Sequence, residues 1–356
     1  MGFTYINDQQ KVRISLTKKA FVTMKEDINT FGVKNIPTFI NTVFDNYKDE
    51  AKSSISLQLE QRKFELETLL ANSNFDPAVK KDIIQKLLKE KEEVLIKEVF
   101  PNKHDLKRDF SKYMDETNTY RINNKNVEYL TTNCNEEKYY NNSAGQYICS
   151  VIEEYCSLPF IEREHIYKKD IYETIEQACK DRNILKIKAP IGNREQEFEV
   201  YPYKILPDSF QTQSYLVCYS KKSVEEESPK IVASFSMARI KKPEVCKHKT
   251  FHFNQEELKN IKKQLSENSP AYLIGKPEHI KVKLTQQGKR NYHTRLYSRP
   301  EKIDELSTDD IYTFNCTQQQ IINYFFSFGE DAEIINPPDL KKRFKKKYHK
   351  ALEKYN

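Results

Sequence analysis

The segment between residues 168 and 237 constrains the fold of this chain more than any other. It opens with a helical pattern in which Ile171, Ile175 and Ala178 recur on one face. Four strand patterns follow, with short connections and punctuating prolines, at residues 184–188, 197–206, 214–220 and 231–237. One helix that leads into several short strands predicts a small antiparallel β-barrel.

The third of these strands, SYLVCYS, alternates without interruption. Leu216 and Cys218 fall on one face, and Tyr215, Val217 and Tyr219 fall on the other. If Leu216 and Cys218 pack the core of the barrel, the two tyrosines face a surface where nucleobases can stack, at about 1–3 kcal/mol per base. The alternative is that both tyrosines are ordinary amphipathic strand residues.

Three motifs in this segment resemble the WYL domain, an Sm-like barrel named for a Trp-Tyr-Leu triplet. They are Pro202 with Ile205, the triplet SYL at residues 214–216, and FSMARI at residues 235–240. Ser214 replaces the tryptophan of the family, and Ala233 and Ser236 stand where many members carry arginine.

The resemblance implies a pocket that senses nucleic acids or ligands, in which Tyr215 and Arg239 match the pocket positions of the family. Cations close to these residues would contact phosphates. We therefore expect single-stranded RNA to bind at Lys188, Tyr203, Lys204, Tyr215, Tyr219, Ser236 and Arg239.

Residues 246–356 resemble the extension that follows many WYL domains, with two strands, a helix that ends in FFSFGEDAEIINPPDL, and a terminal helix. Leu340, Phe344, Tyr348 and Leu352 recur on one face of the terminal helix. The rest of that helix, KKRFKKKYHK, is either a solvated charge run or a basic helix that tracks phosphates.

The N-terminal residues follow the order strand, helix, helix. Residues 11–16 alternate, Thr17 is the predicted N-cap of the first helix, and Asn35 with Pro37 begins the second. A single six-residue strand needs a partner strand, and a second copy of the chain is the simplest supply.

This order resembles the ribbon-helix-helix family, in which two strands from a dimer enter the DNA major groove. The resemblance implies a homodimer in which Lys11, Arg13 and Ser15 hold the base-facing positions. The alternative is a dimerisation module that does not read DNA, since base readout needs specific bidentate side chains.

The residues between these two regions are mostly helical. Residues 118–145 are polar and turn-rich, which suggests a loop or a small irregular element. The sequence thus predicts an α+β multidomain protein with four parts. These are a ribbon-helix-helix domain at 1–50, a helical connector at 51–165, a WYL domain with an Sm-like barrel at 166–245, and a C-terminal α/β extension at 246–356.

Composition indicates the cellular compartment and the chemical class of the partner. The net charge of +7 suits a polyanionic partner. Seven scattered cysteines without a CxxC pair indicate reduced thiols, and we expect a cytoplasmic protein. No segment approaches the roughly 20 apolar residues of a membrane span, so we expect no membrane partner.

The sequence carries no signature of an enzyme. Its seven glycines form neither a dinucleotide-binding motif nor a Walker loop, and no GxSxG or HExxH motif occurs. Cys246, His248 and His252 are of metal-ligand types, but structural zinc needs four ligands, so we interpret them as strand and linker. We expect no catalytic activity, no cofactor and no metal.

A ribbon-helix-helix module joined to a WYL domain resembles the accessory proteins of type VI-D CRISPR systems. The resemblance implies a homodimer that binds single-stranded RNA and stimulates an RNA-guided CRISPR ribonuclease. The alternative is a transcription regulator whose ribbon binds operator DNA and whose WYL domain senses a ligand. A scaffold that binds only protein is a third possibility, and it predicts no salt-sensitive affinity for nucleic acid.

Overall fold

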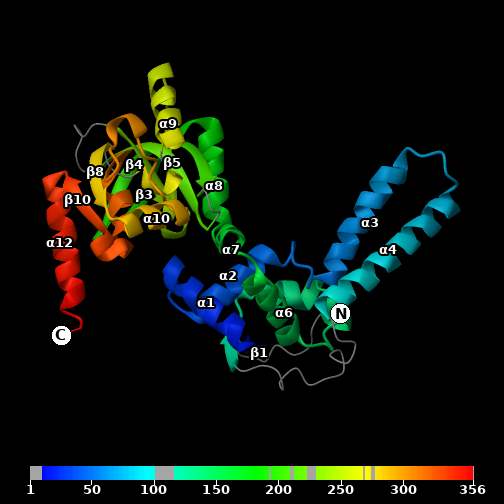
Figure 1. The fold of residues 1–356 in the computed structure, drawn as a ribbon. Helices are drawn as coiled ribbons and strands as arrows, with labels where there is room; N and C mark the ends of the chain where they lie inside the picture. Colours follow the sequence, from blue (N-terminus) through cyan, green and yellow to red (C-terminus); the bar gives the residue numbers. More distant parts are fainter. Residues whose placement is uncertain are drawn as a thin grey trace. The chain divides into compact units, whose positions relative to one another are not determined.

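The computed structural model describes residues 10–100, 116–191, 194–208, 212–222, 230–267, 269–273 and 277–355. The chain divides into two compact units, Met1–Lys169 and Asp170–Asn356 (Figure 1). Each unit combines helices with antiparallel sheet, so the prediction of a multidomain α+β protein is confirmed. The division lies close to the predicted start of the WYL domain at residue 166.

In its described residues, the first unit is mainly helical, with a two-stranded sheet. Its elements are β1 (Lys11–Leu16), α1 (Lys18–Phe31), α2 (Ile36–Tyr47), α3 (Ile55–Ala71), α4 (Pro77–Val99), β2 (Glu116–Arg121), α5 (Asn124–Glu128), η3 (Tyr129–Asn133), η4 (Glu136–Lys138), α6 (Ala144–Ser157) and α7 (Phe160–Tyr167).

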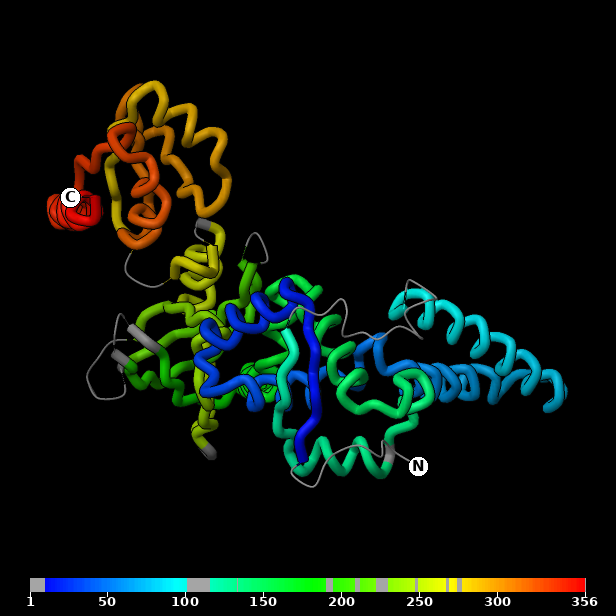
Figure 2. The backbone as a smooth tube through the Cα atoms, turned by 90° about the horizontal axis from the view of Figure 1, so that it is seen from below, coloured from blue at the N-terminus to red at the C-terminus, as the bar shows by residue number. Residues whose placement is uncertain are grey.

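The strand β1 has its partner within the same chain. It pairs antiparallel with β2, from Lys11 opposite Arg121 to Leu16 opposite Glu116, and the two strands run side by side (Figure 2). The expectation that this strand needs a second copy of the chain is therefore wrong. The sequence does not reveal β2 because only Tyr120 of its six residues is buried, which leaves no apolar alternation to detect.

Side-chain caps and an aromatic core hold the helices around this sheet. Thr17 and Asn35 are the N-caps of α1 and α2, as predicted, and their side chains accept hydrogen bonds from backbone amides. Phe44 of α2 packs edge-on against Tyr147 of α6, with ring centroids 5.3 Å apart. The core of this unit thus joins residues before position 50 to residues after position 140.

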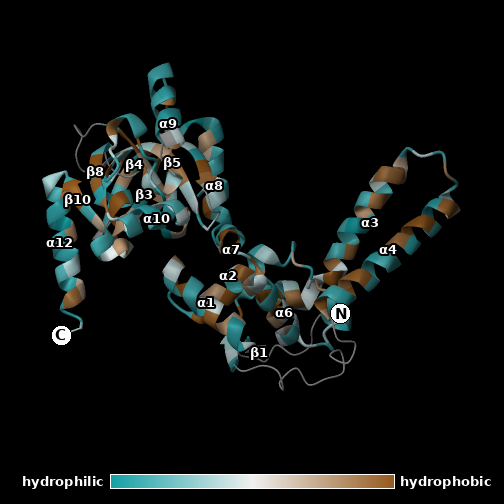
Figure 3. Cartoon of the chain, in the orientation of Figure 1, coloured by the Kyte–Doolittle hydropathy of each residue, from teal (hydrophilic) through white to brown (hydrophobic). Residues whose placement is uncertain are grey.

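Helices α3 and α4 pack together as a hairpin (Figure 1). Apolar residues are scattered along both helices (Figure 3), and Phe64 and Leu69 are each 71% exposed. On α4, Leu87 and Val94 are also exposed, so the apolar residues of this hairpin are only partly covered.

The second unit begins with α8 (Lys169–Asp181) and an antiparallel five-stranded sheet in the order β6-β5-β4-β3-β7. The helix and the short strands follow in the predicted order. The strands are β3 (Asn183–Ile191), β4 (Arg194–Pro207), β5 (Ser214–Lys222), β6 (Ile231–Ser236) and β7 (Lys241–Thr250), and the short turn η5 (Met237–Arg239) joins β6 to β7.

The rest of this unit contains a second antiparallel sheet, in the order β10-β8-β9, together with several helices. On the last helix, Leu340 and Phe344 are buried as predicted, but Leu352 is 58% exposed. The elements are α9 (Gln255–Glu267), η6 (Pro270–Tyr272), β8 (Glu278–Leu284), α10 (Gln286–Thr294), η7 (Asp304–Leu306), β9 (Ile311–Cys316), α11 (Gln318–Phe325), η8 (Phe326–Asp331), β10 (Ala332–Asn336) and α12 (Pro338–Leu352).

Candidate nucleic-acid interfaces

The strand β5 is covered on both faces of its sheet. Leu216 and Cys218 belong to one hydrophobic cluster, and Val217 and Tyr219 belong to another that also contains Ile261 of α9. A strand with one open face would expose alternate residues, and β5 does not. The predicted core residues are therefore correct, but the opposite face is also core.

The two tyrosines of β5 do not form an open stacking surface. Tyr215 is 8% exposed and Tyr219 is 6% exposed. Tyr219 packs against Phe253 at 5.9 Å between ring centroids, and its hydroxyl accepts a hydrogen bond from the Asn260 amide at 3.1 Å. The expectation that both rings face a surface open to bases is wrong, because both are buried and Phe251, Phe253 and Ile261 pack on the Tyr219 side of the sheet.

Tyr215 belongs instead to a polar chain at one end of the sheet. It lies opposite Ser236 across β5 and β6. The Gln213 side-chain nitrogen (Nε2) donates to the Tyr215 hydroxyl at 2.6 Å, and the Ser236 hydroxyl donates to the Gln213 side-chain oxygen (Oε1) at 3.2 Å. Arg239 follows Ser236 by three residues on η5, and its side chain is exposed.

The turn η5 also leads toward Lys188. It connects Ser236 at the end of β6 to Lys241 at the start of β7, and Lys241 lies opposite the exposed Lys188 of β3. Lys241 is partly neutralised by Glu195, with 3.2 Å between the charged atoms. The structure therefore brings Tyr215, Ser236, Arg239 and Lys188 to successive positions around one corner, which we call the η5 corner.

The other predicted RNA contacts lie elsewhere on the sheet. Lys204 is exposed on β4, next to a bulge. It is separated along β4 from Glu197, the residue opposite Lys188, by about 20 Å at the usual rise per residue. Tyr203 is half-buried and packs edge-on against Phe253. The seven predicted residues therefore do not form one cluster.

The two-stranded sheet of the first unit carries a second polar surface. On β1, Val12, Ile14 and Leu16 are buried, so Lys11, Arg13 and Ser15 point outward as predicted. The outward residues of β2 lie directly opposite them. The resulting ribbon face consists of Lys11, Arg13, Ser15, Thr117, Thr119 and Arg121.

Only half of this ribbon face could be predicted from the sequence. Arg121 and Thr119, on β2, lie opposite Lys11 and Arg13. In the segment ETNTYR, Thr117, Thr119 and Arg121 stand at every second position, but no apolar pattern marks the segment as a strand. The Thr117 hydroxyl donates to the Ser15 hydroxyl at 2.9 Å, which ties the two strands together at the far end.

Helix α6 supports the ribbon from behind. A Cβ atom at Gly145 would lie 2.1 Å from the Arg13 carbonyl oxygen, so the backbones of α6 and β1 are in direct contact. The Cys149 thiol donates to the Ser15 carbonyl, and burial raises the pKa of this thiol to about 12. Glu153 accepts hydrogen bonds from the amide and hydroxyl of Thr17.

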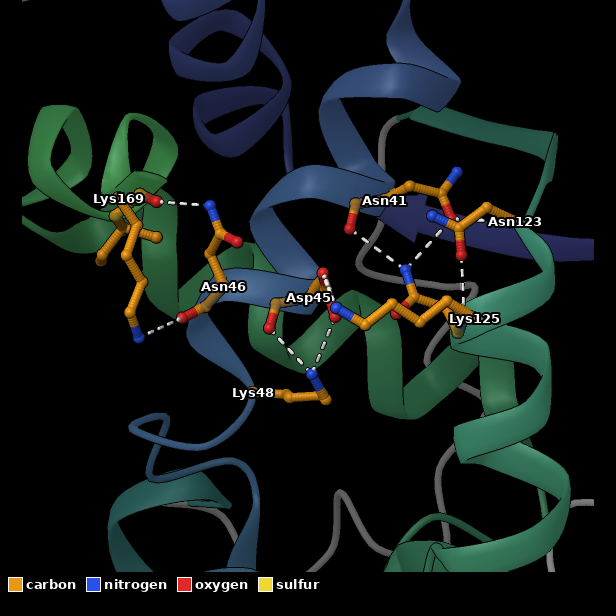
Figure 4. A network of polar contacts seen from close by, with 9 residues as sticks. Asn41, Asp45, Asn46, Lys48, Asn123, Lys125 and Lys169 are labelled. Atoms are coloured by element: carbon orange, nitrogen blue, oxygen red, sulfur yellow. Dashed lines mark hydrogen bonds and ion pairs between the residues drawn. The ribbon is translucent and has the colours of Figure 1, made fainter. Parts of the chain in front are cut away.

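An asparagine network fixes the end of the ribbon to α2 (Figure 4). The Asn41 amide donates to the Arg121 carbonyl at 3.0 Å, and the Asn123 backbone amide donates to the Asn41 side-chain oxygen at 2.8 Å. One turn along, burial opposes ionisation of Asp45, but hydrogen bonds from Lys125 and Lys48 outweigh it and lower the pKa of Asp45. The position of Arg121 is therefore set by side chains of α2.

A shallow hollow of about 720 Å³ lies beside this network, at the N-terminal end of α2. It opens next to Arg121 at the edge of the ribbon face. Its lining is polar apart from Pro37 and Ile122, and includes Gln10, Asn35, Thr38, Asn41, Thr42 and Asn123.

A metal centre and a membrane span are two further classes of site. Within the residues that the structure describes, no three His, Cys, Asp or Glu side chains are grouped as a metal ligand set. In the same part of the chain, no helix is both long enough and apolar enough to cross a membrane.

Comparison with solved structures shows a similarity of fold. The fold resembles a crystal structure described as that of a CRISPR Cas-related protein, with a TM-score of 0.71 and 19% sequence identity over 97% of this chain and 94% of that chain. A second structure, the proteasome accessory factor B/C (PafBC) of Arthrobacter aurescens, matches with a TM-score of 0.26, 12% identity and coverage of 64% and 35%, and carries no argument.

No protein-family model and no curated protein matches the sequence. The chain thus shares its fold, along nearly its whole length, with a CRISPR Cas-related protein. At 19% identity the similarity extends to the fold alone.

Proposed function

We propose that this protein is a cytoplasmic, non-enzymatic accessory protein of a CRISPR system that acts by binding nucleic acid. The observation that carries this proposal is the fold similarity to a CRISPR Cas-related protein over 97% of the chain. The basic balance of the chain and its two exposed basic surfaces, the η5 corner and the ribbon face, support a nucleic acid as the partner.

Single-stranded RNA is the proposed ligand, and the η5 corner is its proposed site. Arg239 and Lys188 are exposed there and supply phosphate contacts. Because the Tyr215 ring is buried, its hydroxyl and the Ser236 hydroxyl act as polar groups at the edge of the site, and no base stacks on Tyr215 or Tyr219. In this proposal the RNA-bound protein stimulates RNA cleavage by an RNA-guided ribonuclease of type VI-D.

A titration of the purified protein against labelled single-stranded RNA, single-stranded DNA and duplex DNA tests this function. We expect the single-stranded RNA to bind most tightly, with an affinity that falls steeply between about 50 and about 200 mM salt. Arg239→Ala with Lys188→Ala is expected to weaken RNA binding at least tenfold. The matched control is Lys81→Ala with Lys86→Ala, which removes the same charge from exposed positions on α4.

Retention of full RNA affinity by the Arg239/Lys188 variant would exclude the η5 corner as the site. Absence of salt-sensitive binding to any nucleic acid would exclude the function itself and favour a protein scaffold. Adding the protein to a type VI-D effector and measuring RNA cleavage tests the final step, since an unchanged cleavage rate contradicts an accessory role.

A second candidate is a transcription regulator that binds operator DNA, and the ribbon face favours it. Two antiparallel strands with only polar and basic outward residues have the form of known β-ribbons that enter the major groove. Both strands come from one chain, so this activity does not depend on a homodimer, which remains a proposal to be tested by the mass of the protein in solution.

The two candidates are distinguished by variants of the ribbon face. If the protein is a duplex reader, Arg13→Ala and Arg121→Ala each weaken binding to the preferred duplex by about 1–3 kcal/mol, and single-stranded RNA competes poorly. If both variants keep the affinity of the unmodified protein for duplex and for RNA, the ribbon face is structural.

A further inference from the structure

One face of α12 carries a row of lysines that neither candidate function uses. Lys342, Lys345, Lys346 and His349 occupy positions i, i+3, i+4 and i+7, so they share one side of the helix. All four side chains are exposed. They line an open hollow of about 690 Å³ together with Tyr348 and Leu352.

In the part of the chain that the structure describes, no acidic side chain pairs with Lys342, Lys345 or Lys346 on this face. Among the described residues, the ion pairs of α12 join Lys341 to Glu333 and His349 to Glu353, and none involves Lys342, Lys345 or Lys346. Lys342 and Lys346 repel each other at i,i+4 spacing. An anion bound across this face would relieve this repulsion.

The opposite face of α12 is fixed to the core. Leu340 and Phe344 are buried in the cluster formed around the sheet β10-β8-β9. Tyr348 stacks on Phe326 at 4.8 Å between ring centroids, and its hydroxyl donates to the Phe326 carbonyl at 3.1 Å. Lys342, Lys345, Lys346 and His349, which we call the lysine face, therefore lie on a helix that is packed against the core of its own unit.

These contacts indicate which class of polyanion can bind to the lysine face. An interfacial membrane helix must insert an apolar face into lipid, and on α12 Leu340 and Phe344 are already buried in the protein, which leaves only Leu352 of this face exposed. A nucleic acid requires only cations along its backbone, and His349 at the rim offers a ring next to them. A flexible single strand can follow a convex helix and enter a shallow hollow, which favours it over a rigid duplex.

We propose that Lys342, Lys345 and Lys346 form a second phosphate-binding surface for single-stranded RNA, with residues distinct from those of the η5 corner. This inference rests on the proposed function, since it assumes that the protein binds RNA. This second surface lengthens the contact between the protein and the RNA phosphate backbone, and the added contact does not depend on base identity.

The triple variant Lys342→Gln/Lys345→Gln/Lys346→Gln tests the proposal in the full-length protein. The probe is a labelled oligouridine of about 20 nucleotides, titrated at several salt concentrations. Because the variant removes three phosphate-binding cations, we expect affinity to fall about 10- to 100-fold and the slope of log K against log salt to decrease by about 2. Glutamine keeps good helix propensity, and thermal unfolding verifies that the fold is retained.

The matched control is Lys81→Gln/Lys86→Gln/Lys89→Gln on α4, which removes the same net charge from exposed positions. An equal loss of affinity in both triple variants would show a nonspecific charge effect and overturn the proposal. An unchanged salt slope in the α12 variant would also overturn it, while RNA binding that is still sensitive to Arg239→Ala would leave the proposed function standing.

If the unmodified protein binds no oligouridine at any salt concentration, both the proposed function and this surface are excluded. Anionic lipid vesicles provide the remaining comparison. Loss of vesicle binding in the α12 variant, together with unchanged RNA binding, would assign the lysine face to a membrane and overturn the proposal.

Discussion

Gly145 and Arg13 are in backbone contact: a Cβ atom on Gly145 would lie 2.1 Å from the Arg13 carbonyl oxygen and 3.3 Å from its carbonyl carbon. No side chain fits between α6 and β1 at this point. The contact places the exposed Arg13 side chain on the opposite side of the strand from α6. The close approach of β1 to α6 therefore depends on a residue without a side chain in the helix behind the strand.

Gly145→Ala is expected to lower the free energy of unfolding by about 2–4 kcal/mol, because β1 must shift to admit the methyl group. Denaturant unfolding measures the change. Gly32→Asn is the control: Gly32 has φ +66° and nothing within 4 Å of an added Cβ atom, and asparagine tolerates this conformation. A Gly145→Ala protein as stable as the control would show that α6 and β1 are not in close contact.

The ion pair of Asp27 with Arg163 links α1 to α7 inside the first unit. Asp27 is 1% exposed and accepts hydrogen bonds from Arg163 Nε at 2.8 Å and from the Tyr155 hydroxyl at 3.0 Å. Asp27→Asn leaves the guanidinium without its counter-charge, so we expect a loss of about 3–5 kcal/mol of stability. The measurement is again denaturant unfolding.

A double-mutant cycle provides the control for this pair. Asp27→Leu combined with Arg163→Met is expected to be less destabilising than the sum of the two single changes, since neither partner is then left as an unpaired charge. Additive effects would show that the two residues do not interact.

The elements that the sequence predicted correctly are those with a local signal. Alternation in residues 11–16 separates the outward residues Lys11, Arg13 and Ser15 from the other face, and the caps Thr17 and Asn35 follow from residues within one turn of the chain. In these cases the residues that determine the local structure are near neighbours in the sequence. The helix and strands from residue 168 onward were found for the same reason.

The features that could not be predicted depend on residues far along the chain. Alternation in β5 separates its two faces correctly, but whether Tyr219 is exposed is decided by Phe253 and Ile261, more than thirty residues later. Pairing of β1 with β2 joins residues about a hundred positions apart, and β2 has too few apolar residues to be recognised. For the same reason Arg121 could not be assigned to the ribbon face before its partner strand was known.

Glu136 makes the stability of the first unit depend on pH. Its side chain is 1% exposed, and burial raises its pKa to about 7 despite hydrogen bonds from the backbone. The folded state therefore keeps its proton while the unfolded state, with an ordinary pKa near 4.5, releases it. Stability is full below about pH 4.5 and falls as the pH rises to about 7, by up to about 3 kcal/mol.

Glu136→Gln isolates this effect. The amide cannot ionise, so the difference in unfolding free energy between the two proteins is expected to grow in favour of the variant from pH 4.5 to pH 7 and then remain constant. Denaturant unfolding at a series of pH values measures it. Parallel pH profiles of the two proteins would show that Glu136 has an ordinary pKa in the folded state.

Tyr219 distinguishes packing from RNA contact. Its ring is buried against Phe253, and its hydroxyl bonds to Asn260 and to the Glu257 carbonyl. Tyr219→Phe keeps the ring and is expected to lower stability by only about 1 kcal/mol, whereas Tyr219→Ala removes it and is expected to lower stability by about 3–5 kcal/mol. At a temperature where both variants remain folded, their RNA affinity should equal that of the unmodified protein. A large loss of RNA affinity in Tyr219→Ala with little change in stability would instead mean that the ring contacts bases, and that Phe253 and α9 move away from β5 when RNA binds.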